Sequence, residues 1–275
     1  MSPAFYPPTR PLGIGEVLDL AIQIFKATAI RGIPYGICAV TFEQLPNIYD
    51  LGSGAVRQPY GGDRPLWLAL FFVGTVLALI AWSALLLQQR AIVEQRSSTL
   101  RPQLTEALRR LPVFVLATLL FFVVVGGDFA ALLLVPDQYH SWVRVPLIVL
   151  SAYLAVALSC TWPAVLLVDQ GPVGALRHSI RLVWGNWWRV CAIYAVGAAA
   201  VMVLAILVAV LIALVVPALV ADIPVMMAVY RVLANAMVAV VAPFAGALVL
   251  AVFGDLRVRK EGIDLQQRIA GLAVE

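Results

Sequence analysis

The sequence predicts an all-α protein, a polytopic integral membrane bundle of six transmembrane helices with three short cytoplasmic interfacial amphipathic helices. Of its 275 residues, 63% are hydrophobic and only 12% are charged, whereas soluble domains carry about 25% charged residues. Uncharged runs long enough to cross a bilayer recur along the chain, with short amphipathic segments between them. This composition excludes a soluble globular enzyme, a disordered chain and a nucleic-acid-binding protein.

Six segments are predicted to span the membrane, because each approaches the roughly 20 mostly apolar residues that a spanning helix needs. Four of them contain no charged residue, and a fifth is interrupted only by Asp128. The first is the weakest, since it contains Pro34, Glu43 and Pro46. In chain order the six segments are about 32–49, 65–89, 111–135, 145–168, 190–221 and 232–254.

The distribution of basic residues predicts the orientation, because Lys and Arg are retained on the cytoplasmic side. With six spans, 15 of the 19 Lys and Arg residues fall in the two tails and in the 90–110 and 169–189 loops, and 4 fall on the other side. Both termini are therefore expected in the cytoplasm. Five spans would move the N-terminus and its basic residues to the outside, so six are preferred.

Three cytoplasmic segments, about 11–27, 102–111 and 172–188, have the pattern of amphipathic helices. Each precedes a pair of spans. The chain is therefore interpreted as one membrane domain, 1–275, with a weak threefold repeat whose units cover roughly 11–90, 101–168 and 171–254.

The third amphipathic segment supplies the first candidate site. Its apolar stripe is predicted to consist of Leu176, Ile180, Val183 and Trp187. Arg177 and Arg181 lie one turn apart on a neighbouring face, and Arg189 follows. Interfacial helices offer such cations to anionic lipid, so the three arginines are the candidate contact for lipid headgroups or a membrane protein partner. Topological anchoring without a specific ligand is the alternative interpretation.

Polar residues at membrane depth supply the second candidate site. Charged residues inside a span normally face protein or a water-filled cavity. Asp128, Glu43 and Asn235 are all expected in the outer half of the bilayer, where they could line a polar cavity of a transporter or lipid-handling protein. Helix-to-helix hydrogen bonding or an interfacial position is the alternative for each.

No catalytic or metal-binding signature is present in the sequence. The chain has two histidines, His140 and His178, and neither has a second ligand at metal-binding spacing. Nucleophile elbows, phosphate-binding loops and zinc-protease motifs are also missing. We therefore expect no enzymatic activity, no cofactor and no metal.

Two stretches, ALRHSIRLVWGNWWRV (175–190) and DLRVRKEGIDLQ (255–266), resemble segments of bacterial polytopic membrane proteins related to the glycerophosphodiester phosphodiesterase membrane domain. The opening RPLGIGEVLDLAIQIFKA (10–27) is also similar to their amphipathic start. The resemblance implies a six-helix protein of the bacterial inner membrane. It implies no phosphodiesterase activity, because that chemistry belongs to a separate soluble barrel domain in fused members, and no catalytic residue carries over.

These observations favour a non-enzymatic integral membrane protein that acts as an accessory or scaffold subunit of a bacterial envelope complex. Its arginine-rich cytoplasmic faces would contact anionic headgroups or a protein partner. The alternative is a transporter or lipid-handling protein that uses the polar cavity around Asp128 and Glu43.

Overall fold

The computed structural model describes residues 6–52, 65–95, 100–132, 140–219 and 222–262, and within these ranges every regular element is a helix. The helices are α1 (Ile14–Glu43), α2 (Leu45–Gly52), α3 (Pro65–Val93), α4 (Leu100–Leu132), α5 (His140–Ala157), α6 (Thr161–Val168), α7 (Pro172–Val183), α8 (Trp187–Leu219) and α9 (Ile223–Glu261). The prediction of an all-α architecture is thus confirmed.

Five segments of the described chain are long and apolar enough to cross a membrane, which makes this a multi-pass membrane protein. They are Pro65–Val93, Pro102–Gly127, Trp142–Val168, Trp187–Leu219 and Val225–Glu261. The predicted first span lies in α1 and α2 and is not among the five. Its Pro, Gly and charged residues lower its mean hydropathy below that of the others.

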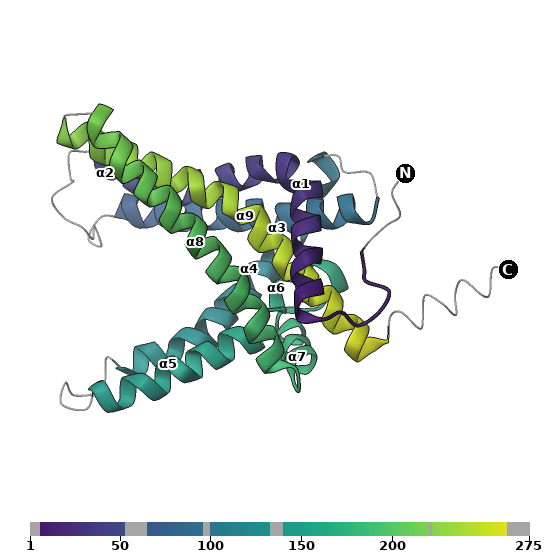
Figure 1. Cartoon of the computed structure of the whole chain (residues 1–275). Coiled ribbons are helices and arrows are strands. Elements are labelled where there is room, and N and C mark those ends of the chain that lie inside the picture. The colour runs from purple at the N-terminus through teal and green to yellow at the C-terminus, as the bar shows by residue number, and fades with distance from the viewer. Residues whose placement is uncertain (1–5, 53–64, 96–99, 133–139, 220–221, 263–275) are drawn as a thin grey trace.

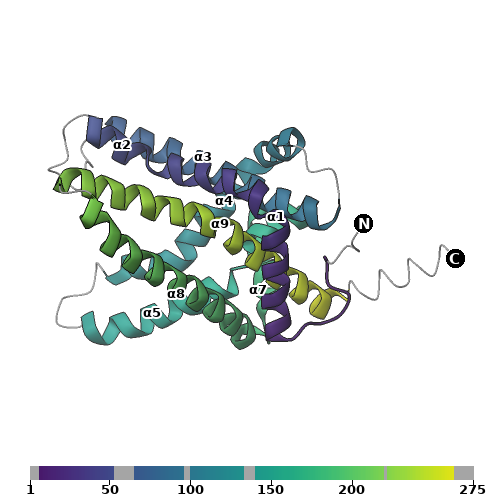
Figure 2. The ribbon, with the colours of Figure 1, turned by 45° about the horizontal axis from the view of Figure 1, so that its top comes forward.

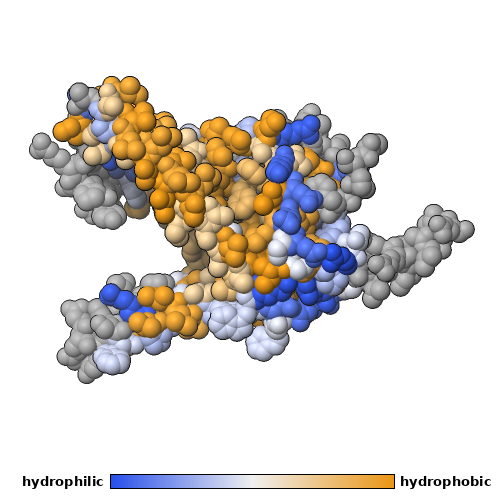
Figure 3. Space-filling model, viewed as in Figure 1, coloured by the Kyte–Doolittle hydropathy of each residue, from blue (hydrophilic) through white to orange (hydrophobic). Residues whose placement is uncertain are grey.

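The helices gather at one end of the molecule and spread toward the other (Figures 1 and 2). The start of α1, α7, the start of α8 and the end of α9 lie at the shared end, whereas the far ends of α5 and α8 diverge. Hydrophilic residues collect over the shared end, and hydrophobic residues cover α8 and the far half of α9 (Figure 3). This separation is what a bilayer requires of a protein that crosses it.

Helix α1 merges the first predicted interfacial helix and the weak first span into one element. Its first part stands across the end of α9, and the chain then turns to run beside α3 and α9 (Figures 1 and 2). Pro34 lies within the helix, and proline is the commonest cause of a sharp bend. Gly36 is needed for close packing, since a Cβ there would lie 2.2 Å from the backbone oxygen of Ala239.

The fourth predicted span is broken between α5 and α6, at residues 158–160. Pro163 explains the break, because it has no N–H for the carbonyl of Ser159 and its ring clashes with that carbonyl. The hydroxyl of Ser179 in α7 forms hydrogen bonds with the backbone on both sides of this break. It accepts from the Cys160 N–H at 3.1 Å and donates to the Ala157 carbonyl at 2.8 Å.

Two arginines close the other end of α6. Arg110 donates to the carbonyls of Val165 and Leu166, at 3.0 and 3.1 Å. Arg90 donates to the carbonyl of Leu167 at 3.2 Å. Cations at a helix C-terminus satisfy its last carbonyls and oppose the negative end of its dipole, so these side chains fix the short helix at the shared end.

Among the three predicted interfacial helices, α7 is the one that stands as a separate short helix in the described residues. The other two continue into α1 and α4, and Pro112 lies where the second meets the predicted span. Helix α7 contacts α4, α6 and α9. Helix α7 therefore packs against the bundle with one face, and its other face lies on the surface of the shared end.

Candidate functional site

Helix α7 presents small and polar side chains to the bundle. Its buried residues are Ala175, His178, Ser179, Leu182 and Val183. Of the predicted apolar stripe, Val183 is buried, Leu176 and Trp187 are half-buried, and Ile180 is exposed. Close contact with neighbouring helices selects the face with small residues and with Ser179, which fits the helix break, and the bulkier Ile180 turns outward with 42% of its surface exposed.

An open cleft of about 750 Å³ lies between the outer face of α7 and the last turn of α9. Arg177 and Arg181 come from α7, and Lys260 and Glu261 come from α9. Trp184, which directly follows α7, closes one side with 67% of its surface exposed. The complete lining is Arg177, Ile180, Arg181, Leu182, Trp184, Lys260 and Glu261.

The cleft is electropositive because its cations outnumber its anions. Arg177 and Lys260 form no hydrogen bond or ion pair with any part of the chain that the structure describes. The one acidic residue of the lining, Glu261, is paired with Arg257 at 2.7 Å. The cleft therefore offers positive charge that no protein group in the described ranges neutralises.

His178 connects Arg181 to Glu261 beneath the cleft. A guanidinium N–H of Arg181 lies 3.0 Å from His178 Nδ1, and His178 Nε2 lies 3.4 Å from a Glu261 oxygen. Burial lowers the pKa of His178, while Glu261 raises it and the arginines nearby lower it. With a neutral ring, Nδ1 accepts from Arg181 and Nε2–H faces Glu261.

Gly185 allows the chain to turn from α7 into α8 beside the cleft. Its φ is 81°, in the left-handed region that favours glycine. A Cβ at this position would also lie 3.8 Å from the ammonium nitrogen of Lys260. The backbone conformation is therefore what favours glycine at this turn, and Lys260 lies at ordinary contact distance from it.

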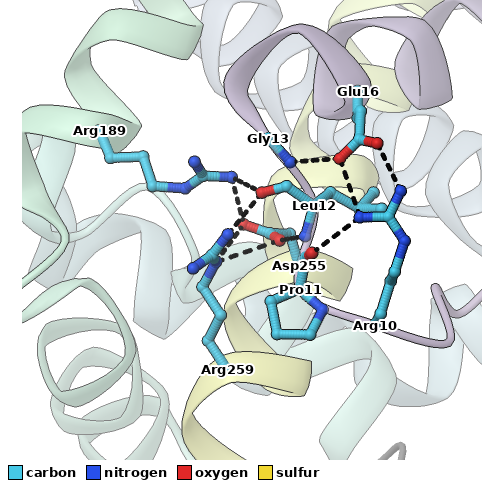
Figure 4. A network of polar contacts seen from close by, with 8 residues as sticks. All are labelled: Arg10, Pro11, Leu12, Gly13, Glu16, Arg189, Asp255 and Arg259. Carbon is cyan, nitrogen blue, oxygen red and sulfur yellow. Dashed lines mark hydrogen bonds and ion pairs between the residues drawn. The ribbon is translucent and has the colours of Figure 1, made fainter.

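Arg189 belongs to a different cluster, centred on Asp255, a carboxylate that is only 1% exposed (Figure 4). Arg189 donates to Asp255 at 3.0 Å, and Arg259 donates from one turn further along α9 at 3.1 Å. The backbone N–H of Leu12 adds a third bond at 2.8 Å. Both arginines also donate to the Leu12 carbonyl.

This cluster fixes the segment that precedes α1 against the end of α9. Tyr6 is buried there, and its hydroxyl donates to the carbonyl of Leu250 at 3.3 Å; burial raises its pKa. Further along, Arg10 pairs with Glu16 on the exposed side of the segment (Figure 4). We call residues 6–13 the N-terminal strap.

The structure therefore divides the three predicted arginines. Arg177 and Arg181 line one cleft, whereas Arg189 is a structural partner of Asp255. Sequence reasoning did not assign Lys260 to the cleft or Asp255 to the strap, because α9 reaches both places only in three dimensions. The spacing of Asp255 and Arg259, one helical turn apart, was the available signal for their ion pair.

The predicted intramembrane polar residues are less closely grouped. Glu43 is the exposed last residue of α1. Asn235 is half-buried in α9, one turn before the Ala239 that packs on Gly36. Asp128 belongs to the last part of α4, and its side chain is outside what the structure describes. The cavity that these residues were predicted to line therefore stays a prediction.

Within the described ranges, no group of three or more His, Cys, Asp or Glu side chains is arranged to hold a metal ion. What the cleft can do chemically is bind an anion, since it combines guanidinium and ammonium donors with an exposed indole ring. Its residues include no nucleophile with an adjacent base.

The chain matches no protein-family model, and no curated protein or solved structure is significantly similar to it. The resemblance to the glycerophosphodiester phosphodiesterase membrane domain therefore stays a prediction. The class that the fold defines is a helical multi-pass membrane protein with a polar, cationic end.

Proposed function

We propose that this protein is a non-enzymatic scaffold or accessory subunit in a bacterial inner membrane, with six spans and both termini in the cytoplasm. In this proposal α1, bent near Pro34, combines an interfacial first part with a sixth crossing. The polar shared end faces the cytoplasm, where it contacts anionic headgroups and a membrane protein partner.

The observation that supports this proposal best is how the shared end is built. Three segments distant in sequence, namely the strap, the start of α8 and the end of α9, are joined there through the buried Asp255. A carboxylate that accepts several charge-assisted hydrogen bonds fixes its partners in position. Such an end presents a constant surface, as a scaffold requires, and its cleft contains no catalytic set.

The basic residues support the cytoplasmic orientation. Arg90, Arg110, Arg177, Arg189 and Arg259 all lie at the shared end, on the elements that meet there. Lys and Arg concentrate on the cytoplasmic side of membrane proteins. The far ends of α8 and α9 carry the apolar surface that lipid covers.

A transport function has weaker support. It would need Asp128, Glu43 and Asn235 to converge on one pathway, and Glu43 is exposed at the end of its helix. Helix α9, which carries Asn235, packs mainly on α1, α8 and α3, whereas α4 packs mainly on α3, α5, α6 and α7.

Purification of the full chain from its native membranes in mild detergent tests the proposal. We expect a membrane protein to be retained in fixed stoichiometry, and Asp128→Asn to leave that association intact. A chain that purifies alone and supports an ion or solute flux in proteoliposomes, lost on Asp128→Asn, would overturn the scaffold proposal in favour of transport. Cysteine labelling of the tail at the periplasmic surface would refute the orientation.

A further inference from the structure

Some basic residues of the shared end already form hydrogen bonds or ion pairs with protein groups, and others do not in the part of the chain that the structure describes. Arg90 and Arg110 donate hydrogen bonds to carbonyls of α6. Arg189 and Arg259 donate to Asp255 and to the Leu12 carbonyl. Such residues have structural partners and offer little to a ligand.

The cleft between α7 and α9 differs because its cations are available. Arg177 and Lys260 have no partner in the ranges that the structure covers. Arg181 uses one nitrogen on His178, and the remaining N–H groups of its guanidinium are left for a ligand. Three cations from two helices thus surround one open space, and such a set favours an anion with several acceptor oxygens, as in a phosphate.

The apolar part of the cleft indicates that the anion carries a hydrophobic group. Ile180 and Trp184 are both exposed beside the cations, and Trp188 follows with 79% of its surface exposed. Indole rings concentrate at the headgroup level of membranes. A small soluble phosphate would leave these side chains unused, whereas a lipid would contact them with its glycerol and the upper part of its acyl chains.

We propose that Arg177, Arg181 and Lys260 form a binding site for the phosphate of an anionic phospholipid, with Trp184 and Ile180 contacting the glycerol and acyl region. This proposal rests on the proposed function in one respect: the cytoplasmic orientation of the shared end makes the cytoplasmic leaflet the source of the lipid. Helices α7 and α9 pack directly on each other beside the site, and His178 of α7 lies 3.4 Å from Glu261 of α9.

Binding is measured on the purified full chain in detergent by native mass spectrometry. The probes are a short-chain phosphatidylglycerol, a short-chain phosphatidylcholine and soluble glycerol phosphate. The test variants are Arg177→Gln with Arg181→Gln, and Trp184→Ala. The control is Arg109→Gln, which removes one positive charge, against two in the double variant, from an α4 side chain that is 82% exposed and lies outside the cleft.

We expect phosphatidylglycerol to bind in preference to phosphatidylcholine. Each cation near a membrane surface contributes about fivefold in affinity, so the double variant should bind phosphatidylglycerol roughly 30-fold more weakly. Arg109→Gln should bind it like the original chain. Trp184→Ala should weaken binding of the lipid and leave the weak binding of glycerol phosphate unchanged.

Three outcomes would overturn the site. Equal affinity for both phospholipids would contradict recognition of negative charge. A loss of about fivefold in Arg109→Gln, the same per removed charge as in the double variant, would reduce the effect to overall charge. Glycerol phosphate that binds as tightly as the lipid would assign the site to a soluble phosphate compound. Elution on size exclusion and the melting temperature without lipid report whether each variant is folded. Each of these outcomes leaves the scaffold proposal standing, because that is tested by co-purification.

Discussion

Replacement of Asp255 by asparagine tests whether the buried carboxylate holds the N-terminal strap to the bundle. Asparagine has the same size and can still accept from the Leu12 N–H. It lacks the charge that faces Arg189 and Arg259, and it can place an NH₂ group against their guanidinium groups. The variant thus removes the electrostatic part of the cluster with little change in packing.

The expected loss follows from the bonds involved. A hydrogen bond that includes a charged group contributes about 1.5–3 kcal/mol, against about 1 kcal/mol for a neutral one. Asp255 makes three side-chain interactions of the first kind, but the two guanidinium groups are partly exposed and solvent weakens their share. We therefore expect Asp255→Asn to lower the free energy of unfolding by about 2–4 kcal/mol.

The measurement is the melting temperature of the full chain in one detergent, together with hydrogen exchange of the N-terminal peptide. The loss corresponds to a fall of roughly 4–8 °C for a chain of this length, and the Leu12 amide should exchange faster. Glu16→Gln is the matched control, because it removes an exposed carboxylate that holds the same strap through Arg10. Our reasoning is refuted if both variants lower the melting temperature equally, or if exchange at Leu12 does not change.

Three further predictions concern stability, each read as a change in unfolding free energy or melting temperature. Ser179→Ala leaves the Cys160 N–H and the Ala157 carbonyl unpaired, which should cost about 1–3 kcal/mol; Thr75→Ala, whose hydroxyl bonds within its own helix, should be nearly neutral. Gly36→Ala forces α1 from α9 and should cost about 1–3 kcal/mol, whereas Gly15→Ala, with open space around its Cβ, should cost nothing. Burial lowers the pKa of His178 in the folded chain, so as the pH falls the unfolded chain binds a proton at His178 before the folded chain does. The free energy of unfolding should therefore decrease as the pH drops below about 6.5. The same pH profile in His178→Gln would contradict this.

Much of the fold could be predicted because the information is local. The spans at 65–89 and 232–254 lie within α3 and α9, and the span at 190–221 lies within α8 up to residue 219, with 220–221 outside the described residues. These spans could be predicted because length and hydropathy alone decide whether a helix can cross a membrane. Pro163 is a local signal of the same kind, because a proline inside a helix interrupts its hydrogen bonds. The chain does break just before it, over residues 158–160.

Contacts between distant segments could not be predicted in this way. The continuity of α1 depends on a buried face that recurs every fourth residue, through Ile24, Thr28, Gly32 and Gly36. The glycines lower the hydropathy of this segment while allowing its close contact with α9. The role of Ser179 depends on a break in another helix, which no pattern within 172–183 reveals.

The basic residues are the clearest example of this limit. A count of Lys and Arg treats them as equivalent, yet Arg110 closes a helix end, Arg189 and Arg259 hold a buried carboxylate, and Arg177 and Lys260 face an open cleft. The charge bias that orients a membrane protein therefore over-predicts its binding sites. A basic residue becomes a candidate ligand contact only after its carbonyl and carboxylate partners are known. In the cleft between α7 and α9, two cations without such partners in the described chain, Arg177 and Lys260, lie together with a third, Arg181, around one open space.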